Sequence, residues 1–286
     1  MTEVVIRRAA ARRPGGTAAA VLRRPGGFIG AGLVLVVVAV AFVGPLLGGT
    51  PGEFVASPFA TPGGGHVFGA DNLGRDVLAL FLSGGRRLLI IVFFATVIGV
   101  SAGACVGLVI GVSRGRVARL MLAAVDVYLA FPFYLFILIF VAVVGSNLVG
   151  VVLVVAIVHV APVARVVRPV VAEVSQRDFV QASRAIGVPR RKILLGEILP
   201  NVVPTLSVEY GIRLVFSVGI VTGLSFLGFG TPPGTPDWGR MIADNQIGLT
   251  VQPWPVILPC VAIALLSVGA NMVTDTVARA TGIGDS

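Results

Sequence analysis

Long apolar runs, separated by short polar or glycine-rich segments, dominate the hydrophobic pattern of this chain. Six of these runs approach or exceed the ~20 residues that a helix needs to cross the hydrocarbon core of a bilayer. The runs are Phe28–Leu47, Leu88–Val112, Val117–Val144, Leu148–Val167, Val202–Leu227 and Trp254–Val277. The pattern predicts an all-α, polytopic membrane protein with six transmembrane helices.

The composition supports a membrane protein over a soluble one. Of the 286 residues, 56% are hydrophobic and 12% are charged, whereas soluble domains carry about 25% charged residues. The first apolar run, Phe28–Leu47, is too long for the apolar region of a signal peptide, and no A-x-A site follows it. We therefore expect an uncleaved first transmembrane helix behind a basic tail, residues 1–27.

The net charge of +9 comes almost entirely from arginine. In a soluble protein this balance would suggest nucleic acid as a partner, but here the basic residues lie between apolar runs and form no platform with aromatic residues. With the N-terminus inside, 17 basic residues fall in cytoplasmic pieces and four in outside pieces, and Arg213 lies within a span. The asymmetry predicts that both termini are cytoplasmic.

This orientation divides the chain into alternating segments. Residues 28–47 form the first span and 48–87 an outside segment, in which Asp71 is expected to cap a short helix beginning near Asn72. Residues 88–277 form a five-helix core with a cytoplasmic segment at 170–201 and a turn-rich outside loop at 228–253, which contains a Trp238 suited to burial. Residues 278–286 form a cytoplasmic tail.

The cytoplasmic segment contains the sequence "QASRAIGVPRRKILLGEILPN", Gln181–Asn201. Asp178 followed by Gln181 is a variant of the capping box, and Gly187 suits the left-handed position that ends a helix. One face of the short helix between them carries Phe179, Ala182, Ser183 and Ile186. Pro189 is expected in the first turn of a second helix, and Pro200 and Pro204 are expected to mark re-entry into the membrane.

A helix of two turns is not stable alone and needs a partner surface. Small residues allow close approach to a groove, and the neighbouring arginines would attract an acidic partner. The alternative is a solvated basic loop beside anionic lipid. We favour docking, because attraction to lipid requires neither a glycine stop nor a phased face.

At these residues the chain resembles the EAA loop of ABC-importer permeases, whose pattern is E-A-A-x3-G-x9-I-x-L-P. Three positions depart from it: Gln181 replaces Glu, Ser183 replaces the second Ala and Glu197 replaces Ile. The resemblance implies a surface that couples to an ATPase, and its expected residues are Asp178, Phe179, Gln181, Ala182, Ser183, Gly187, Leu199 and Pro200.

Four further stretches between Phe68 and Asp275, among them "FGADNLGRDVLALFLSGGRRLL" and "LSFLGFGTPPGTPDWGRMIADN", resemble dipeptide and oligopeptide permeases of the DppC/OppC type. Val221 departs from an acidic residue that is usual in that branch. The resemblance implies a type I ABC-importer permease of the bacterial inner membrane. It also implies a homologous second permease subunit, two cytoplasmic ATPases that use ATP and Mg²⁺, and an external peptide-binding protein.

The residues themselves give no sign of catalysis. The chain has no G-x4-G-K-[ST] motif, so a separate ATPase would have to supply energy. Cys105 and Cys260 lie far apart in apolar runs and are expected to be small buried residues rather than metal ligands. We predict a transport subunit that is not an enzyme and holds no cofactor or metal of its own.

Charged and polar residues within spans are the remaining candidates. Glu209 and Arg213 have the spacing of an ion pair, which would either read peptide termini or only pack helices. Asp126 is expected to pair with Arg119 or to face the ATPase side, and His159 is expected to bond a backbone carbonyl. The predicted translocation path consists of Glu209, Arg213, Ser217, Thr222 and Ser225.

Two other functions stay open at this point. A nickel-importing permease of the same superfamily would differ in its lining, and a chain poor in histidine argues mildly against it. A proton-coupled secondary transporter would use Glu209, Asp126 and His159 as a relay. Four glycines spaced four apart are expected to pack helices rather than to form a site; they are Gly99, Gly103, Gly107 and Gly111.

Overall fold

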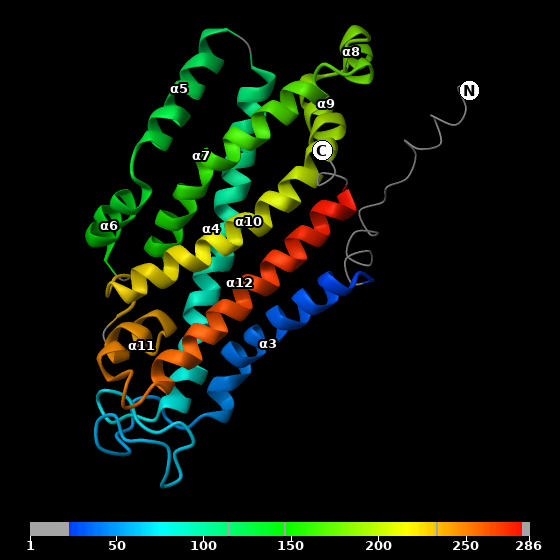
Figure 1. Cartoon of the computed structure of the whole chain (residues 1–286). Helices are drawn as coiled ribbons and strands as arrows, with labels where there is room; N and C mark the ends of the chain where they lie inside the picture. Colours follow the sequence, from blue (N-terminus) through cyan, green and yellow to red (C-terminus); the bar gives the residue numbers. More distant parts are fainter. Residues whose placement is uncertain (1–22, 114, 146, 233, 282–286) are drawn as a thin grey trace.

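The computed structural model describes residues 23–281 except 114, 146 and 233, and in this part the regular secondary structure is helical, with isolated β-bridges in the loops (Figure 1). The long helices are α3 (Pro25–Leu47), α4 (Val77–Val112), α7 (Leu148–Val174), α10 (Leu199–Phe226) and α12 (Trp254–Thr281). The shorter helices are α5 (Arg116–Ala130), α6 (Phe133–Val144), α8 (Asp178–Ala185), α9 (Arg190–Ile193), η1 (Leu194–Ile198), α11 (Trp238–Asn245) and η2 (Gln246–Gly248). The predicted tails lie largely outside the described residues.

Five helical stretches are long and apolar enough to cross a membrane, and a sixth span results if α5 and α6 are counted together. These two helices are bent by 86° at their break, which agrees with the kink that Pro132 within the run Val117–Val144 predicts. Pro132 causes the break, because it has no backbone N–H to donate and disfavours helical geometry at Phe131 before it. The expectation of an all-α polytopic protein is confirmed.

Two helix boundaries differ from the apolar runs. The helix of the second span, α4, begins at Val77 rather than Leu88, where the Asp76 carboxylate accepts the N–H of Ala79 at 2.9 Å. Asp71 does not cap a helix near Asn72 but accepts hydrogen bonds from the backbone and guanidinium of Arg75. The length of an apolar run matches the thickness of the bilayer. A helix, by contrast, begins and ends where its terminal N–H and C=O groups find capping partners, so the two boundaries need not coincide.

Helices α4 and α7 pack most closely. The four α4 glycines face α7 residues that are also four apart, and a Cβ at Gly103 would lie 2.6 Å from the Cβ of Val163. The matching contacts of the other glycines are with His159, Val167 and Val171. The predicted packing role of these glycines is confirmed. Both cysteines, by contrast, are exposed on the outside of the bundle rather than buried.

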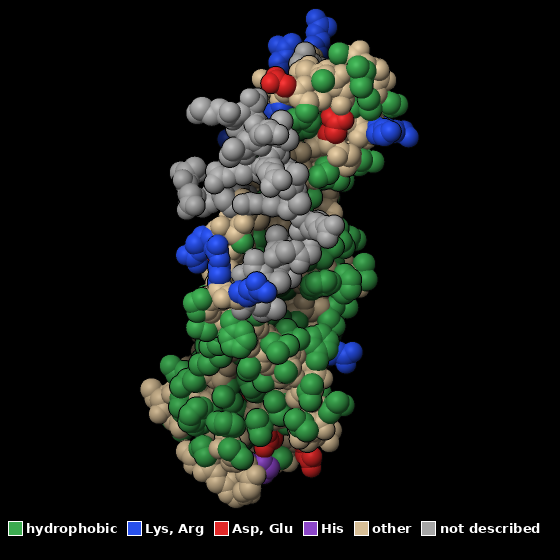
Figure 2. All heavy atoms as spheres, turned by 90° about the vertical axis from the view of Figure 1, so that its right-hand side faces the viewer, with side chains coloured by type: hydrophobic (Ala, Val, Ile, Leu, Met, Phe, Trp, Pro, Cys, Tyr) green, Lys and Arg blue, Asp and Glu red, His purple; other side chains and the backbone are tan. Residues whose placement is uncertain are grey.

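The long loop before α4 and the α11 region form a cap at the end of the molecule opposite α8 (Figure 1). Trp238 is fully buried there, as expected, and its indole N–H donates to the carbonyl of Phe81 at 2.8 Å. The Gln252 amide donates to the carbonyls of Ala60 and Phe68. Figure 2 shows hydrophobic side chains gathered over the middle and lower part of one face, with Lys and Arg toward the α8 end.

Candidate functional site

The short helix α8 ends as the sequence predicts. Gly187 has a φ of 79°, the left-handed conformation that glycine adopts readily. Its N–H donates to the carbonyl of Arg184, and the N–H of Val188 donates to the carbonyl of Ser183, both at 3.1 Å. These two bonds form a Schellman motif, which gives α8 a defined end.

The beginning of α8 differs from the capping box. Arg177 precedes the helix, and its side chain forms no capping hydrogen bond. Asp178 lies in the first turn, where its negative charge interacts favourably with the positive end of the helix dipole. The Gln181 amide instead donates to the carbonyl of Ser175 at 3.0 Å. The predicted capping box is wrong because the chain turns at Ser175–Arg177, so that Arg177 occupies the N-cap position. Asp178, the predicted cap, is already the first residue of the helix. Gln181 therefore ties α8 to the segment that leads into it.

One side of α8 is anchored and the other is free. Val180 is fully buried in an apolar cluster that contains residues of α4, α7, α9, η1 and α10. Phe179, Ala182 and Ile186, three of the four residues of the predicted docking face, are exposed. Ser183, the fourth, turns toward the body and donates its hydroxyl to the Glu197 carboxylate at 2.7 Å. An exposed aromatic beside a small residue suits contact with a partner surface.

Helix α9 continues into α10 through the π-helical turn η1, so no separate helix begins at Pro200. Leu199 and Pro200 form the first residues of α10, and the N–H of Leu199 reaches back to the carbonyl of Leu194. Wider turns of this kind accommodate irregular positions inside a long helix. The coupling residues predicted from the sequence are thus shared by α8 and the beginning of α10.

A hollow of about 890 Å³ lies between α8–α9–η1 and the C-terminal end of α4. Its walls include Arg184, Arg190 and Arg191, and Val112 and Ser113 line it from α4. The α8 region is therefore not packed tightly against the end of α4.

The expected ion pair within the fifth span is present. The Arg213 Nε lies 3.0 Å from a Glu209 carboxylate oxygen, and both side chains are largely buried. The Arg213 guanidinium also lies over the ring of Phe216. Each charge thus has a partner within α10, which lowers the cost of keeping both inside a span.

A second buried polar group joins three helices. The His159 Nε2 lies 2.7 Å from the Ser217 hydroxyl, which lies 3.0 Å from the Thr96 hydroxyl. Thr96 in turn donates to the carbonyl of Val92. The expected partner of His159 was a carbonyl, but its partner is Ser217. Nothing in the sequence indicated this group, because its members come from α4, α7 and α10.

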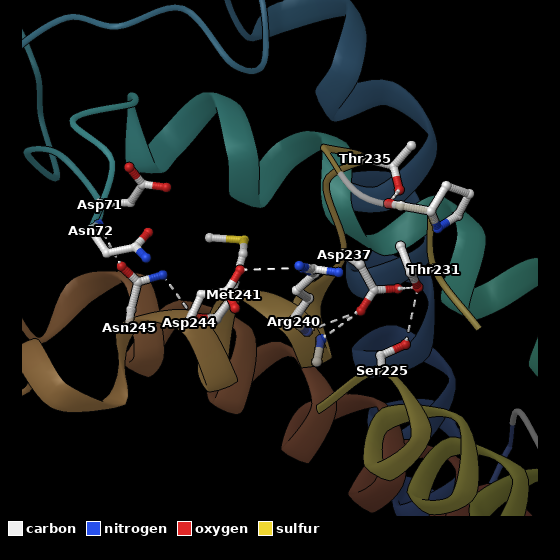
Figure 3. A network of polar contacts seen from close by, with 12 residues as sticks. Asp71, Asn72, Ser225, Thr231, Thr235, Asp237, Arg240, Met241, Asp244 and Asn245 are labelled. Atoms are coloured by element: carbon white, nitrogen blue, oxygen red, sulfur yellow. Dashed lines mark hydrogen bonds and ion pairs between the residues drawn. The ribbon is translucent and has the colours of Figure 1, made fainter. Parts of the chain in front are cut away.

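The other predicted path residues lie near the C-terminal end of α10. Ser225 is buried, and its hydroxyl is 3.3 Å from that of Thr231, which donates to the Asp237 carboxylate (Figure 3). The Thr222 hydroxyl is buried and has no hydrogen-bond partner among the described residues. In this chain Ser217 and Ser225 thus contact their own bundle.

Asp237 organises this outer region. Its carboxylate caps α11 by accepting the N–H groups of Gly239 and Arg240 (Figure 3). Burial raises the pKa of Asp237 above its usual value, although hydrogen bonds from these groups, Ser225 and Thr231 act in the opposite direction. A buried carboxylate with four donors can hold the α10–α11 connection in one geometry.

Asp126 lies exposed on α5 and forms no ion pair with Arg119 in the described structure, so the predicted pair is wrong. The described residues also contain no group of three or more His, Cys, Asp or Glu that could hold a metal ion.

Comparison with known proteins places this geometry in a family. Residues 103–282 match the family described as "Binding-protein-dependent transport system inner membrane component". The chain is 33% identical over 214 residues to the glutathione transport system permease protein GsiD of Pectobacterium atrosepticum, which covers 75% of this chain and 71% of that protein. It is 36% identical over 210 residues to GsiD of Shigella boydii, with coverages of 73% and 69%.

The fold has a counterpart among solved structures. An inward-facing structure of the MetNI methionine ABC transporter matches with a TM-score of 0.54 at 21% identity, covering 69% of this chain and 96% of that one. At this identity the likeness concerns the fold alone. The chain belongs to the family of binding-protein-dependent transport system inner membrane components, as a non-catalytic, multi-span permease subunit of an ABC importer.

Proposed function

We propose that this permease imports peptide-like solutes, a class that includes di- and oligopeptides and glutathione, and that α8 receives the motion of a cytoplasmic ATPase. The observation that carries the coupling proposal is α8 itself. It is anchored by Val180, is stopped at Gly187 and presents an exposed Phe179 and Ala182. The substrate class is supported by the relatives, which are glutathione permeases by name.

A second permease subunit and an external binding protein complete the proposed transporter. Exposed apolar side chains on α10 support a contact outside this chain, since Phe216 and Phe226 are exposed and a Cβ at Gly219 would meet no atom of the described residues within 4 Å. We infer that this face lines the path between two permeases. The groups predicted to line the path would then lie on the bundle side of α10 instead and fix the rotation of this helix about its axis. They are the Glu209–Arg213 pair and the hydroxyls of Ser217, Thr222 and Ser225.

The proton-coupled alternative has no support in this geometry. Glu209 pairs with Arg213, His159 bonds Ser217, and Asp126 lies exposed on α5, so no hydrogen bond among the described residues connects the three groups. Family membership instead assigns the chain to a binding-protein-dependent system.

The proposed function is tested with the whole transporter reconstituted in vesicles with its ATPase, second permease and binding protein. Radiolabelled glutathione, a dipeptide and a tetrapeptide are offered outside, with ATP inside. We expect ATP-dependent uptake of at least one of the three and none when the binding protein is omitted. Uptake driven by a proton gradient without ATP would contradict the proposal, as would ATP-dependent uptake of Ni²⁺ but of none of the three peptides.

A further inference from the structure

The hydrogen bond between Ser183 and Glu197 joins the coupling helix α8 to the π-helical turn η1. These two residues are also the two places where the chain substitutes polar side chains for apolar positions of the EAA-type pattern. They are 14 residues apart in the sequence and meet in the structure at 2.7 Å. A polar residue at either position alone would leave a partly buried group without a partner, whereas together they satisfy each other.

The carboxylate of Glu197 depends on this bond. Its second oxygen is buried and has no hydrogen-bond partner among the described residues. The Ser183 hydroxyl is therefore the one side-chain donor to this carboxylate that the described structure shows. A hydrogen bond to a charged acceptor is stronger than one between neutral groups. The bond between Ser183 and Glu197 therefore holds α8 to η1 more strongly than a bond between two neutral side chains would.

The other attachments of α8 are of a different kind. Gln181 bonds Ser175 in the segment that leads into α8, so this bond does not tie α8 to the membrane helices beyond α7. Val180 is buried against apolar residues, which resist separation but allow sliding. The hollow of about 890 Å³ also separates the α8–α9 region from the end of α4. A directional bond therefore links α8 to η1, which continues directly into α10, while the hollow beside α4 leaves room for movement.

We propose that Ser183 and Glu197 form a positioning pair that makes α8 and the beginning of α10 move as one body when the ATPase acts. The pair transmits displacement of α8 to α10, the helix whose uncovered face we assign to the path. This inference rests on the proposed coupling role of α8. It gives Glu197 a function that the family pattern, with Ile at this position, does not contain.

Four variants of the full transporter test the pair. Ser183→Ala and Glu197→Ile each break the bond, the double variant Ser183→Ala/Glu197→Ile restores the apolar combination of the pattern, and Ser183→Thr keeps the hydroxyl. The measurement is substrate taken up per ATP hydrolysed. Each breaking variant should lower this ratio by about tenfold, the equilibrium effect of one hydrogen bond to a charged group, and the double and Thr variants should stay within about twofold of the parent.

A second measurement does not depend on the substrate. Spin labels at Ala185 on α8 and Val203 on α10, in a background without Cys105 and Cys260, report the distance between the two helices with and without ATP. In the parent protein the distance distribution should stay the same, and in Ser183→Ala or Glu197→Ile it should shift or broaden with ATP.

The two measurements separate the possible failures. A parent transporter that takes up none of the peptides would contradict the proposed function but leave the distance measurement as a test of the pair. Unchanged ratios and unchanged distances in both breaking variants would overturn the pair, as would a double variant as defective as Glu197→Ile alone. If a breaking variant loses the ATPase during purification, the amount of ATPase retained replaces the ratio in the same comparison.

Discussion

At the level of single residues, the α10 side chains divide into those that face their own bundle and those that do not. Ser217 and Ser225 are almost completely buried and bond His159 and Thr231. Phe216 is exposed, and Gly219 one turn away has open space where a side chain would project. A helix that leaves a glycine uncovered inside a membrane protein allows another surface to approach closely.

The first prediction follows from this open position. Gly219→Trp should lower uptake by about tenfold, the effect of ~1–2 kcal/mol of steric conflict in a path that must admit a peptide. The transporter should still assemble, because a Cβ at this position would have no atom of the described residues within 4 Å. Uptake and subunit recovery are measured together, with Leu35→Trp on the exposed side of α3 as control. Full uptake in an assembled Gly219→Trp transporter would remove this face from the path.

The second prediction concerns Asp237, whose pKa is raised by burial. A carboxyl group whose folded-state pKa lies above its unfolded value of about 3.8 stabilises the fold below that value. This contribution is lost as the pH rises through the higher folded-state pKa. The unfolding temperature of the purified permease should therefore fall as the pH rises from about 3.8, the unfolded-state pKa, to the higher folded-state pKa of Asp237.

Asp237→Asn is the matched control for this pH effect, because Asn keeps the cap of α11 but does not titrate. The fall in unfolding temperature across the window should be smaller in Asp237→Asn than in the parent. An identical pH profile in the two proteins would show that Asp237 does not carry the effect.

At the level of elements, the geometry of α8 depends mainly on the turn at Gly187 that ends the helix. The Schellman bonds require Gly187 in a left-handed conformation, and no atom of the described residues lies within 4 Å of a Cβ placed there. Backbone conformation, rather than crowding, is therefore what a substitution at this position tests.

The third prediction is that Gly187→Val reduces recovery of the ATPase with the permease, because a β-branched residue is strained at positive φ. Gly187→Asn should retain most of the ATPase, since Asn tolerates this conformation better than other residues. Co-purification of the ATPase measures both. Equal recovery with Val and Asn would mean that the geometry of the α8 end is not needed for docking.

At the level of the whole molecule, the two ends differ in chemistry. The α8 end carries a cluster of arginines, whereas the opposite cap holds Asp71, Asp76 and Asp237 in bonded, partly or fully buried positions. With the basic end in the cytoplasm, the cap would face the external binding protein.

The fourth prediction tests this orientation. Single cysteines at Val67 and Thr235, in a background without Cys105 and Cys260, should react with an impermeant thiol reagent in intact cells. A cysteine at Gln176, beside α8, should react only after lysis. All three positions are exposed in the structure, so access to the reagent depends on the side of the membrane. The reverse labelling pattern would invert the topology.

Properties that depend on neighbours along the chain could be read from the sequence. Apolar runs predicted the membrane helices, spacing predicted the Glu209–Arg213 pair and the packing glycines of α4, and Gly187 predicted the end of α8. Each depends on residues within a few turns of one another, where the geometry of a helix already determines which side chains meet. The exact helix ends were less predictable, because caps such as Asp76 compete with nearby candidates such as Asp71.

Contacts between distant segments required the folded chain. Local periodicity does not relate α4, α7 and α10, so it could not join Thr96, His159 and Ser217, and it could not show that Ser225 bonds Thr231. The same is true of Ser183 and Glu197, which looked like two unrelated departures from a motif. Helix packing decides such contacts, because the rotation and depth of each helix follow from the fit of all its neighbours together.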